Sequence, residues 1–167
     1  TPGNMRACLD QLRNLSARSE ASAADMCWRL ARACHNMADE LKQQDKKKYA
    51  DEIKQLSYEA KSFADAALSA APSDFRSHYW VGIAIQDVAD FEGTKYLLTN
   101  LPLVRERFQT AHELNPAEAM PLYCLGAYCW GLASMSWVTR NLAAAIFATP
   151  PSATYDEAYT YYRKAED

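Results

Sequence analysis

Three segments of the sequence repeat one spacing of apolar residues, and this repetition constrains the fold more than any other feature. They read Ala60-x3-Ala64-x2-Ala67-x4-Pro72, Val104-x3-Phe108-x2-Ala111-x4-Pro116 and Ala158-x3-Tyr162-x2-Ala165. Residues at these steps share one face of an α-helix, where small side chains let a neighbouring helix approach and larger ones fill the gap. Proline follows the first two segments because it cannot continue a helix. The spacing predicts three helices that each pack through the same face.

A second shared pattern precedes each of these segments. It reads Leu30-x2-Ala33-Cys34-x2-Met37, then His78-x2-Val81-Gly82-x2-Ile85, then Leu122-x2-Leu125-Gly126-x2-Cys129. The small residue beside the apolar stripe again permits close helix contact, and each glycine accepts a helix-propensity cost of about 1 kcal/mol. Two helices with these steps resemble the tetratricopeptide repeat (TPR), whose period is about 34 residues. The predicted fold class is all-α, a superhelix of about three TPR-like antiparallel helix pairs.

The period in this sequence is longer than in a TPR, which predicts inserted extra helices. Ala67 and Ala111 lie 44 residues apart, and Ala111 and Ala165 lie 54 residues apart. The first insertion contains Gly93 beside acidic and hydroxyl residues, a pattern typical of a turn. The second, residues 136–158, reads SWVTRNLAAAIFATPPSATYDEA.

This second insertion is predicted to form an amphipathic helix that ends at Thr149-Pro150-Pro151. Its apolar face is predicted from helical spacing to hold Val138, Leu142, Ala145 and Ile146. The capping box Thr154-x-x-Glu157 then starts a new helix at Tyr155. Two roles for the inserted helix stay open. It closes the last repeat by packing, or it forms a lid over a groove through Trp137, Leu142, Ile146 and Phe147.

The composition fits one helical domain. With 167 residues, 49% of them hydrophobic, the chain can bury one sizeable core. Residues 26–167 are predicted to form this single TPR-like domain. Residues 1–25 are predicted to form an N-terminal extension whose leucines at positions 9, 12 and 15 are spaced as on a helix.

Charge and cysteine content exclude several classes of function. A formal charge of −3 gives no overall field that captures nucleic acid, so no nucleic-acid partner is expected. The five cysteines are odd in number and include no C-x-x-C pair, which argues against a disulfide framework or a zinc site and favours a reducing compartment. The longest apolar run is too short for a transmembrane segment. The start at Thr1-Pro2-Gly3 is typical of a segment of a longer chain, so the presence of an upstream membrane anchor is left open.

The concave side of such a superhelix is lined by the first helix of each pair. Counting from the packing stripe, the residues predicted to face this groove are Trp28, His35, Arg76, Tyr79, Ile83, Gln86, Met120, Tyr123 and Trp130, together with Ala31 and Ala127. This set is unusually apolar and aromatic for side chains on a protein surface. It either receives a partner peptide or an acyl chain, or it packs on the inserted helices as core.

A cluster of lysines marks a second candidate surface. It comprises Lys42, Lys46, Lys47, Lys48, Lys54 and Lys61. Lysines grouped in this way bind a flexible acidic polymer through many weak, salt-sensitive contacts. The alternative interpretation is a solvated helix end, which is the usual role of a run of charges.

The sequence offers no motif for catalysis, and no catalytic residue, metal site or cofactor is predicted. The three histidines, His35, His78 and His112, belong to separate predicted helices without the H-x3-H spacing of metal ligands. Neither a nucleophile elbow nor a Gly-rich phosphate loop is present. His78 lies on a packing stripe and is predicted to be a hydrogen-bonded core residue, while Cys124 and Cys129 are predicted to be buried.

Four stretches resemble the regulator of microtubule dynamics (RMD) family. They are FEGTK at 91–95, RERFQTAHELNP at 105–116, LGAYCW at 125–130 and, most specifically, SWVTRNLAAAIFATPPSATYDEA at 136–158. The resemblance runs from about Trp28 to the C-terminus, and residues 1–25 carry little of it.

This resemblance implies a non-enzymatic, microtubule-associated protein with a TPR-like binding domain, acting in spindle function and chromosome segregation. Tubulin or microtubules are then the expected partner, through the lysine cluster, and the expected location is cytoplasmic, at the cytoskeleton or spindle. The alternatives are a phospholipid-binding or transfer module at membrane contact sites, which needs an upstream anchor, and a TPR adaptor that binds a peptide in the groove.

Overall fold

The computed structural model describes residues 2–16 and 23–166, and in these ranges the chain forms helices and no strand. The predicted all-α class is confirmed. The helices of the described residues are α1 Pro2–Ser16, α2 Ala23–Asp45, α3 Ala50–Ala70, α4 Phe75–Glu92, α5 Thr94–Leu114, α6 Ala119–Ala133, α7 Trp137–Ile146 and α8 Tyr155–Glu166.

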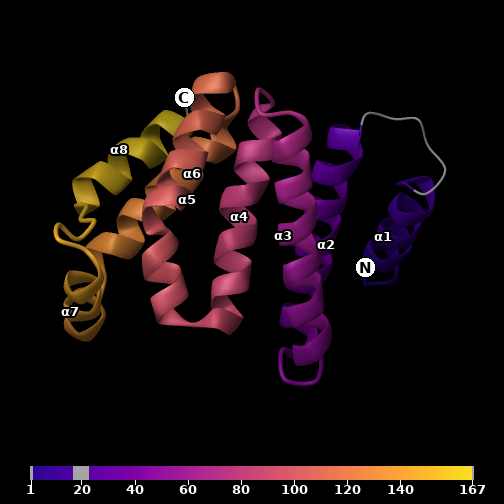
Figure 1. The fold of residues 1–167 in the computed structure, drawn as a ribbon, viewed down its shortest axis with the longest axis horizontal. Coiled ribbons are helices and arrows are strands. Elements are labelled where there is room, and N and C mark those ends of the chain that lie inside the picture. Colours follow the sequence, from indigo (N-terminus) through magenta and orange to yellow (C-terminus); the bar gives the residue numbers. More distant parts are fainter. Residues whose placement is uncertain (1, 17–22, 167) are drawn as a thin grey trace.

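The helices stack as side-by-side pairs. α2 packs against α3, α4 against α5, and α6 against α8, so each of the two shared sequence patterns falls on one member of a pair. Figure 1 shows the pairs arranged in a row in chain order, with α1 beyond α2 at one end and α7 and α8 at the other. This arrangement is compatible with three TPR-like units. In the third unit, α7 separates the two paired helices along the chain.

Local signals in the sequence set the helix ends. Gly93, with φ of 82°, forms the one-residue turn between α4 and α5, a conformation that glycine adopts without steric cost. Asp74 caps α4, because its carboxylate accepts from the backbone N–H of Arg76 at 3.0 Å. The predicted capping box of α8 is confirmed: Thr154 N donates to Glu157 Oε2 at 2.6 Å, and Glu157 N donates to Thr154 Oγ1 at 3.1 Å.

The predicted packing faces are buried. Ala60, Ala64 and Ala67 of α3 lie inside, as do Val104, Phe108 and Ala111 of α5. Gly82 of α4 lies against the ring of Phe108, where a β-carbon would be only 2.6 Å from the nearest ring atom. Close approach of α4 and α5 therefore depends on the absence of a side chain at this position.

The buried apolar residues form two clusters where the sequence predicted one core. One cluster lies in α1, α2 and α3, and the other extends from α4 to α8 with contributions from α2 and α3. Phe63 of α3 packs against both. A stack of helix pairs grows along one axis, so its interior is a row of neighbouring cores. Leu9 of α1 is buried in the first cluster.

The predicted apolar face of the inserted helix is wrong. α7 packs against α5 through buried Ala143, while Val138 is 70% exposed and Ala145 is exposed too. Ile146 alone of the predicted face is half-buried. A small residue at the contact lets two helices approach more closely than large side chains do, and this contact turns the larger residues of α7 outward.

Candidate functional site

The largest described hollow is a groove of about 560 Å³ across the N-terminal halves of α2 and α4 and the start of α6. Five residues predicted to face a groove line it, namely Trp28, His35, Arg76, Tyr79 and Met120. It has five further lining residues that the sequence argument did not assign, namely Arg32, Asn36, Phe75, Trp80 and Glu118. Arg32 and Asn36 follow Trp28 at steps of four, a helical spacing that would have located them. Glu118 and Phe75 lie at helix starts. Residue spacing within one helix does not show which other helices lie next to its first residues.

The remaining predicted groove residues lie elsewhere. Tyr123 and Trp130 of α6 turn toward α8, where their ring centroids lie 5.3 Å from Tyr162 and 4.8 Å from Tyr155. Tyr123 and Trp130 are 53% and 54% exposed, so these aromatic pairs lie at the edge of the α6–α8 contact, whose interior includes buried Ala158. The other members do not line this groove either: Ala31 is completely buried, Ile83 is half-buried against the core, and Gln86 and Ala127 line a different pocket.

The predicted lid is also absent from this groove. α7 follows the C-terminal end of α6, whereas the groove uses the residues at the start of α6. Trp137, at the beginning of α7, is 76% exposed, and Leu142 is 39% exposed. Phe147 follows the helix and is half-buried. Chain direction therefore carries the insertion away from the groove, which stays open.

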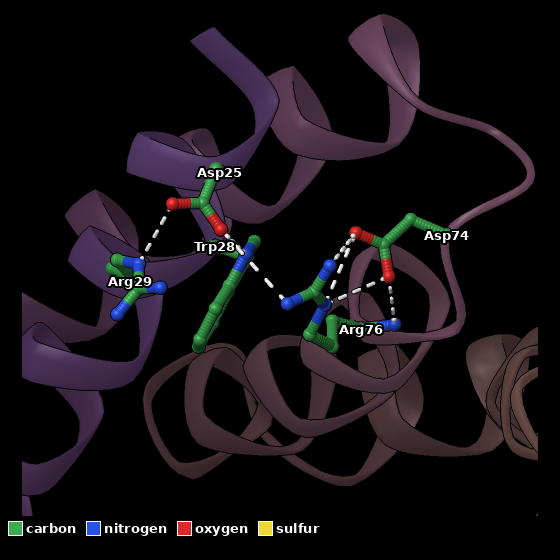
Figure 2. Close-up of polar contacts among 5 residues, drawn as sticks. All are labelled: Asp25, Trp28, Arg29, Asp74 and Arg76. Carbon is green, nitrogen blue, oxygen red and sulfur yellow. Dashed lines mark hydrogen bonds and ion pairs between the residues drawn. The ribbon is translucent and has the colours of Figure 1, made fainter. Parts of the chain in front are cut away.

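One wall of the groove is a stack of an indole and a guanidinium, shown in Figure 2. The Arg76 guanidinium lies 4.9 Å from the centre of the Trp28 ring. The Asp74 carboxylate accepts three hydrogen bonds from the Arg76 guanidinium, two from Nε at 2.9 and 3.1 Å and one from Nη2 at 2.8 Å. On the other side, Asp25 accepts from Trp28 Nε1 at 2.9 Å and from Arg29 Nε at 2.9 Å. These carboxylates neutralise both arginines and fix the Trp28 ring.

Hydrogen bonds from these partners lower the pKa of both carboxyl groups. For Asp25, the bond from Arg29 is the main cause of the lowered pKa. For Asp74, burial raises the pKa, but the hydrogen bonds and charge of Arg76 outweigh that effect. Both groups are therefore carboxylates at neutral pH. The wall contributes no net charge to the groove.

Two charged groups and one carboxamide of the groove have no partner among the described residues. Arg32 and Glu118 form no ion pair with any described residue, and the Asn36 carboxamide forms no hydrogen bond with one. Burial raises the pKa of Tyr79, and among the lesser causes Glu118 raises it while Arg32 lowers it. Both charges therefore act on the Tyr79 hydroxyl from within the same groove.

An ion network joins α2 to α4 behind the groove. His35 Nδ1 lies 2.7 Å from Asp87 Oδ2, and Lys42 Nζ lies 3.3, 3.8 and 3.4 Å from oxygens of Asp39, Asp87 and Asp90. Lys42 therefore belongs to this network and is not a free member of the predicted lysine cluster. Burial lowers the pKa of His35, but the hydrogen bond and charge of Asp87 outweigh burial and hold the pKa above its ordinary value.

The same network is the one group of described side chains whose ligand atoms converge as in a metal site. His35, Asp39 and Asp87 place theirs within 4.8 Å of one another. The Lys42 ammonium already supplies the cation for these carboxylates. The charges of this group are thus balanced by contacts between side chains of α2 and α4.

Four lysines of the predicted cluster have no acidic partner among the described residues. Lys61 is excluded, because its Nζ lies 2.6 Å from Asp65. The side chain of Asp45 accepts from the backbone N–H of Lys47 at 3.1 Å and of Lys48 at 3.0 Å, which shapes the turn between α2 and α3. The exposed lysines at this turn and on the first turns of α3 are Lys46, Lys47, Lys48 and Lys54.

A separate apolar pocket of about 310 Å³ lies among α4, α5, α6 and the beginning of α7. Leu97, Leu101 and Val104 of α5 line one side, and Leu132 and Met135 the other. The Tyr128 hydroxyl at this pocket is buried and has no hydrogen-bond partner among the described residues. Most of the residues that line this pocket are apolar.

The predictions for the buried histidine and cysteines are confirmed. His78 is 5% exposed, with Nε2 placed 2.8 Å from the carbonyl oxygen of Pro72 and Nδ1 placed 3.2 Å from Arg107 Nη1. Nε2 therefore donates to the carbonyl, and Nδ1 accepts from the guanidinium. Cys124 and Cys129 are both buried. In the described residues no helix is long and apolar enough to cross a membrane.

Comparison with known protein families gives a match along nearly the whole chain. The family described as regulator of microtubule dynamics protein 1-3 matches residues 4–167. The match thus begins within the N-terminal extension, earlier than the resemblance from about Trp28 that the motifs indicated.

Individual relatives agree with this match. The chain is 41% identical to human regulator of microtubule dynamics protein 1 over 139 residues, which are 83% of this chain and 43% of the relative. It is 40% identical to the mouse protein of the same name, over 89% of this chain and 47% of the relative. It is 31% identical to regulator of microtubule dynamics protein 3 of Xenopus laevis, over 86% of this chain and 30% of the relative. The chain spans less than half the length of these relatives, and it belongs to the regulator of microtubule dynamics protein 1-3 family.

Proposed function

We propose that this chain contacts microtubules directly, through the exposed lysines of the α2–α3 turn, as a non-enzymatic regulator associated with the cytoskeleton. The names of the relatives describe regulators of microtubule dynamics. Action during spindle function and chromosome segregation is part of the same proposal. The observation that supports it is the group Lys46, Lys47, Lys48 and Lys54, whose charges are not neutralised by described residues.

The location of these lysines suits a flexible acidic partner. Figure 1 shows the α2–α3 turn at the tip of a long helix hairpin, away from the other pairs. Lys48 Nζ lies 4.8 Å from the centre of the Tyr49 ring, so the ammonium is held against an aromatic face while it stays exposed. Acidic tails of tubulin can reach an exposed tip without fitting a shaped cavity. Contacts of this kind weaken as ionic strength rises.

Changing Lys46, Lys47 and Lys48 together to glutamate is expected to reduce cosedimentation with microtubules at least tenfold. The reason is that three attractive contacts become repulsive. For the unchanged chain, binding is expected to fall steeply between low and physiological salt. Cosedimentation across a salt series measures both effects.

A matched variant separates a local effect from one of total charge. Arg140, Arg163 and Lys164 are exposed cations on α7 and α8, at the far end of the row of helices. Changing these three to glutamate alters the net charge by the same amount and is expected to leave most of the binding intact. Equal loss in both triple variants, or binding that does not respond to salt, contradicts the proposed contact.

The apolar pocket between α5, α6 and α7 favours a second candidate function, binding of a phospholipid acyl chain. Aliphatic residues and Met135 make up most of its lining, beside Gln86, Ser136 and Thr139. The Tyr128 hydroxyl, which has no partner among the described residues, offers a hydrogen bond to an ester carbonyl. The volume of about 310 Å³ suits part of one chain. The open groove lined by Arg32, Glu118 and Asn36 is less suited to lipid, because an acyl chain would leave these polar groups unpaired.

Filling this pocket is expected to abolish acyl-chain binding. Leu101→Trp adds volume at the pocket wall, and a fluorescent fatty-acid analogue titrated into both proteins measures the loss. Tyr79→Trp in the open groove is the control and is expected to leave this binding unchanged. Retention of the signal in Leu101→Trp, with its loss in Tyr79→Trp, would place the chain in the groove instead.

A further inference from the structure

The open groove continues across α2 into a neighbouring hollow. A pocket of about 370 Å³ lies between α1 and α2, and Met5, Cys8 and Leu12 of α1 form one of its walls. Trp28, Arg32 and Asn36 line both this pocket and the groove. These three residues follow one another at steps of four on α2 and form a ridge between two hollows. Arg32 and Asn36 thus place polar groups on α2 between two hollows that each have apolar side chains in their lining.

The ridge carries unused hydrogen-bonding capacity. Arg32 is exposed and has no ion-pair partner among the described residues, in contrast to Arg29 and Arg76 on the same surface. Asn36 can both donate and accept, which matches the donor and acceptor of a peptide unit. A guanidinium binds a carboxylate through two parallel hydrogen bonds.

We propose that this surface binds an extended peptide segment in which an acidic residue lies between two large apolar residues, in the order apolar-x-acidic-x-apolar. The carboxylate pairs with Arg32, Asn36 bonds the peptide backbone, and the apolar side chains enter the hollows on either side. In an extended chain, alternate side chains point the same way, so all three anchors face the protein. The outer two anchors are about 13 Å apart, close to the width of one helix, about 10–12 Å.

The charges of the groove select against a run of acids. Glu118 lies in the larger hollow without a cationic partner among the described residues, so a second carboxylate placed there is repelled. The larger hollow instead presents Phe75, Tyr79 and Trp80, which favour an aromatic or aliphatic side chain. This site is therefore distinct from the lysines of the α2–α3 turn and does not rest on microtubule contact.

The test is a peptide titration followed by calorimetry and by the fluorescence of Trp28 and Trp80. The probe is Ac-Gly-Leu-Ser-Glu-Ser-Phe-Gly-NH2, compared with the same peptide carrying Gln in place of Glu. The unchanged chain is expected to bind the Glu peptide about tenfold more tightly, because charge-assisted hydrogen bonds are roughly twice as strong as neutral ones. Arg32→Gln is expected to remove this preference while keeping the weaker binding of the Gln peptide.

Matched controls make each outcome decisive. Arg105→Gln, an exposed arginine on α5, is expected to keep the tenfold preference. Arg32 is exposed and has no ion-pair partner among the described residues, so thermal melting of Arg32→Gln is expected to match that of the unchanged chain. Absence of binding by either peptide, a preference that survives Arg32→Gln, or equally tight binding of hexaglutamate would each overturn the proposal. The last result would assign the groove to acidic tails.

Discussion

Gly82→Ala is expected to lower the free energy of unfolding by about 2 kcal/mol, although alanine is the better helix former by about 1 kcal/mol. The added β-carbon would lie 2.6 Å from Phe108 Cε1 and 2.8 Å from Cζ. Phe108 is completely buried, so its ring has no room to retreat. α4 and α5 must then separate, at the cost of their packing. Urea unfolding followed by circular dichroism measures the change.

Two other glycines supply graded controls for this experiment. Gly131 of α6 has no atom within 4 Å of a β-carbon, so Gly131→Ala is expected to stabilise the protein by about 1 kcal/mol. Gly126 would place its β-carbon 2.8 Å from the Tyr162 ring, which is only half-buried and can rotate. The change in the free energy of unfolding caused by Gly126→Ala is therefore expected to lie between those of Gly82→Ala and Gly131→Ala. Equal stability of Gly82→Ala and Gly131→Ala would show that the Phe108 contact does not control packing.

Asp87→Asn is expected to lower the free energy of unfolding by about 2 kcal/mol at pH 6, because it removes the α4 carboxylate that the half-buried cations His35 and Lys42 share. Asp87 is 10% exposed as a side chain and contacts both His35 and Lys42. These contacts join α2 to α4, so their loss weakens the junction between the first two units. Asp90→Asn is the matched control on the same helix. It is expected to have little effect, because the Asp90 side chain is 47% exposed.

The same variant changes the pH dependence of stability. The folded-state pKa of His35 is raised, so its contribution to stability is complete below the ordinary histidine pKa of about 6.5 and is lost as pH rises through the raised value. In Asp87→Asn this pKa is expected to fall, because burial still lowers it and, among the described residues, only the Asp39 carboxylate still raises it. The contribution of protonated His35 to stability at low pH is then expected to be smaller than in the unchanged chain. An NMR titration of the His35 ring, with urea unfolding from pH 5.5 to 8.5, measures both changes, and an unaltered His35 pKa would contradict this account.

The order of helices was predictable because it rests on local chemistry. Prolines after two of the packing stripes, the turn at Gly93 and the Thr154–Glu157 capping box act within a few residues of their own positions. The repeated small-and-large stripe likewise predicted which faces are buried.

The groove was only partly predictable, because residues from different helices must meet to form it. Spacing along α2 and α4 selected Trp28, His35 and Tyr79, which line this groove in the structure. On α6 the spacing also selected Tyr123 and Trp130, which do not line this groove and lie more than half exposed beside aromatic residues of α8. A helical pattern shows that a face is apolar and leaves open which neighbour covers it.

The sequence by itself determined the helices, their ends, their paired packing faces and membership of the family. Only the tertiary structure decided that Lys42 is neutralised by Asp39, Asp87 and Asp90 and that α7 packs through Ala143. It also decided that Arg32 lies between two hollows without an ion-pair partner among the described residues. The physical reason is the separation along the sequence of the residues that interact. Helix formation depends on residues a few positions apart, whereas ion pairing and burial depend on groups that chain folding brings together from distant positions.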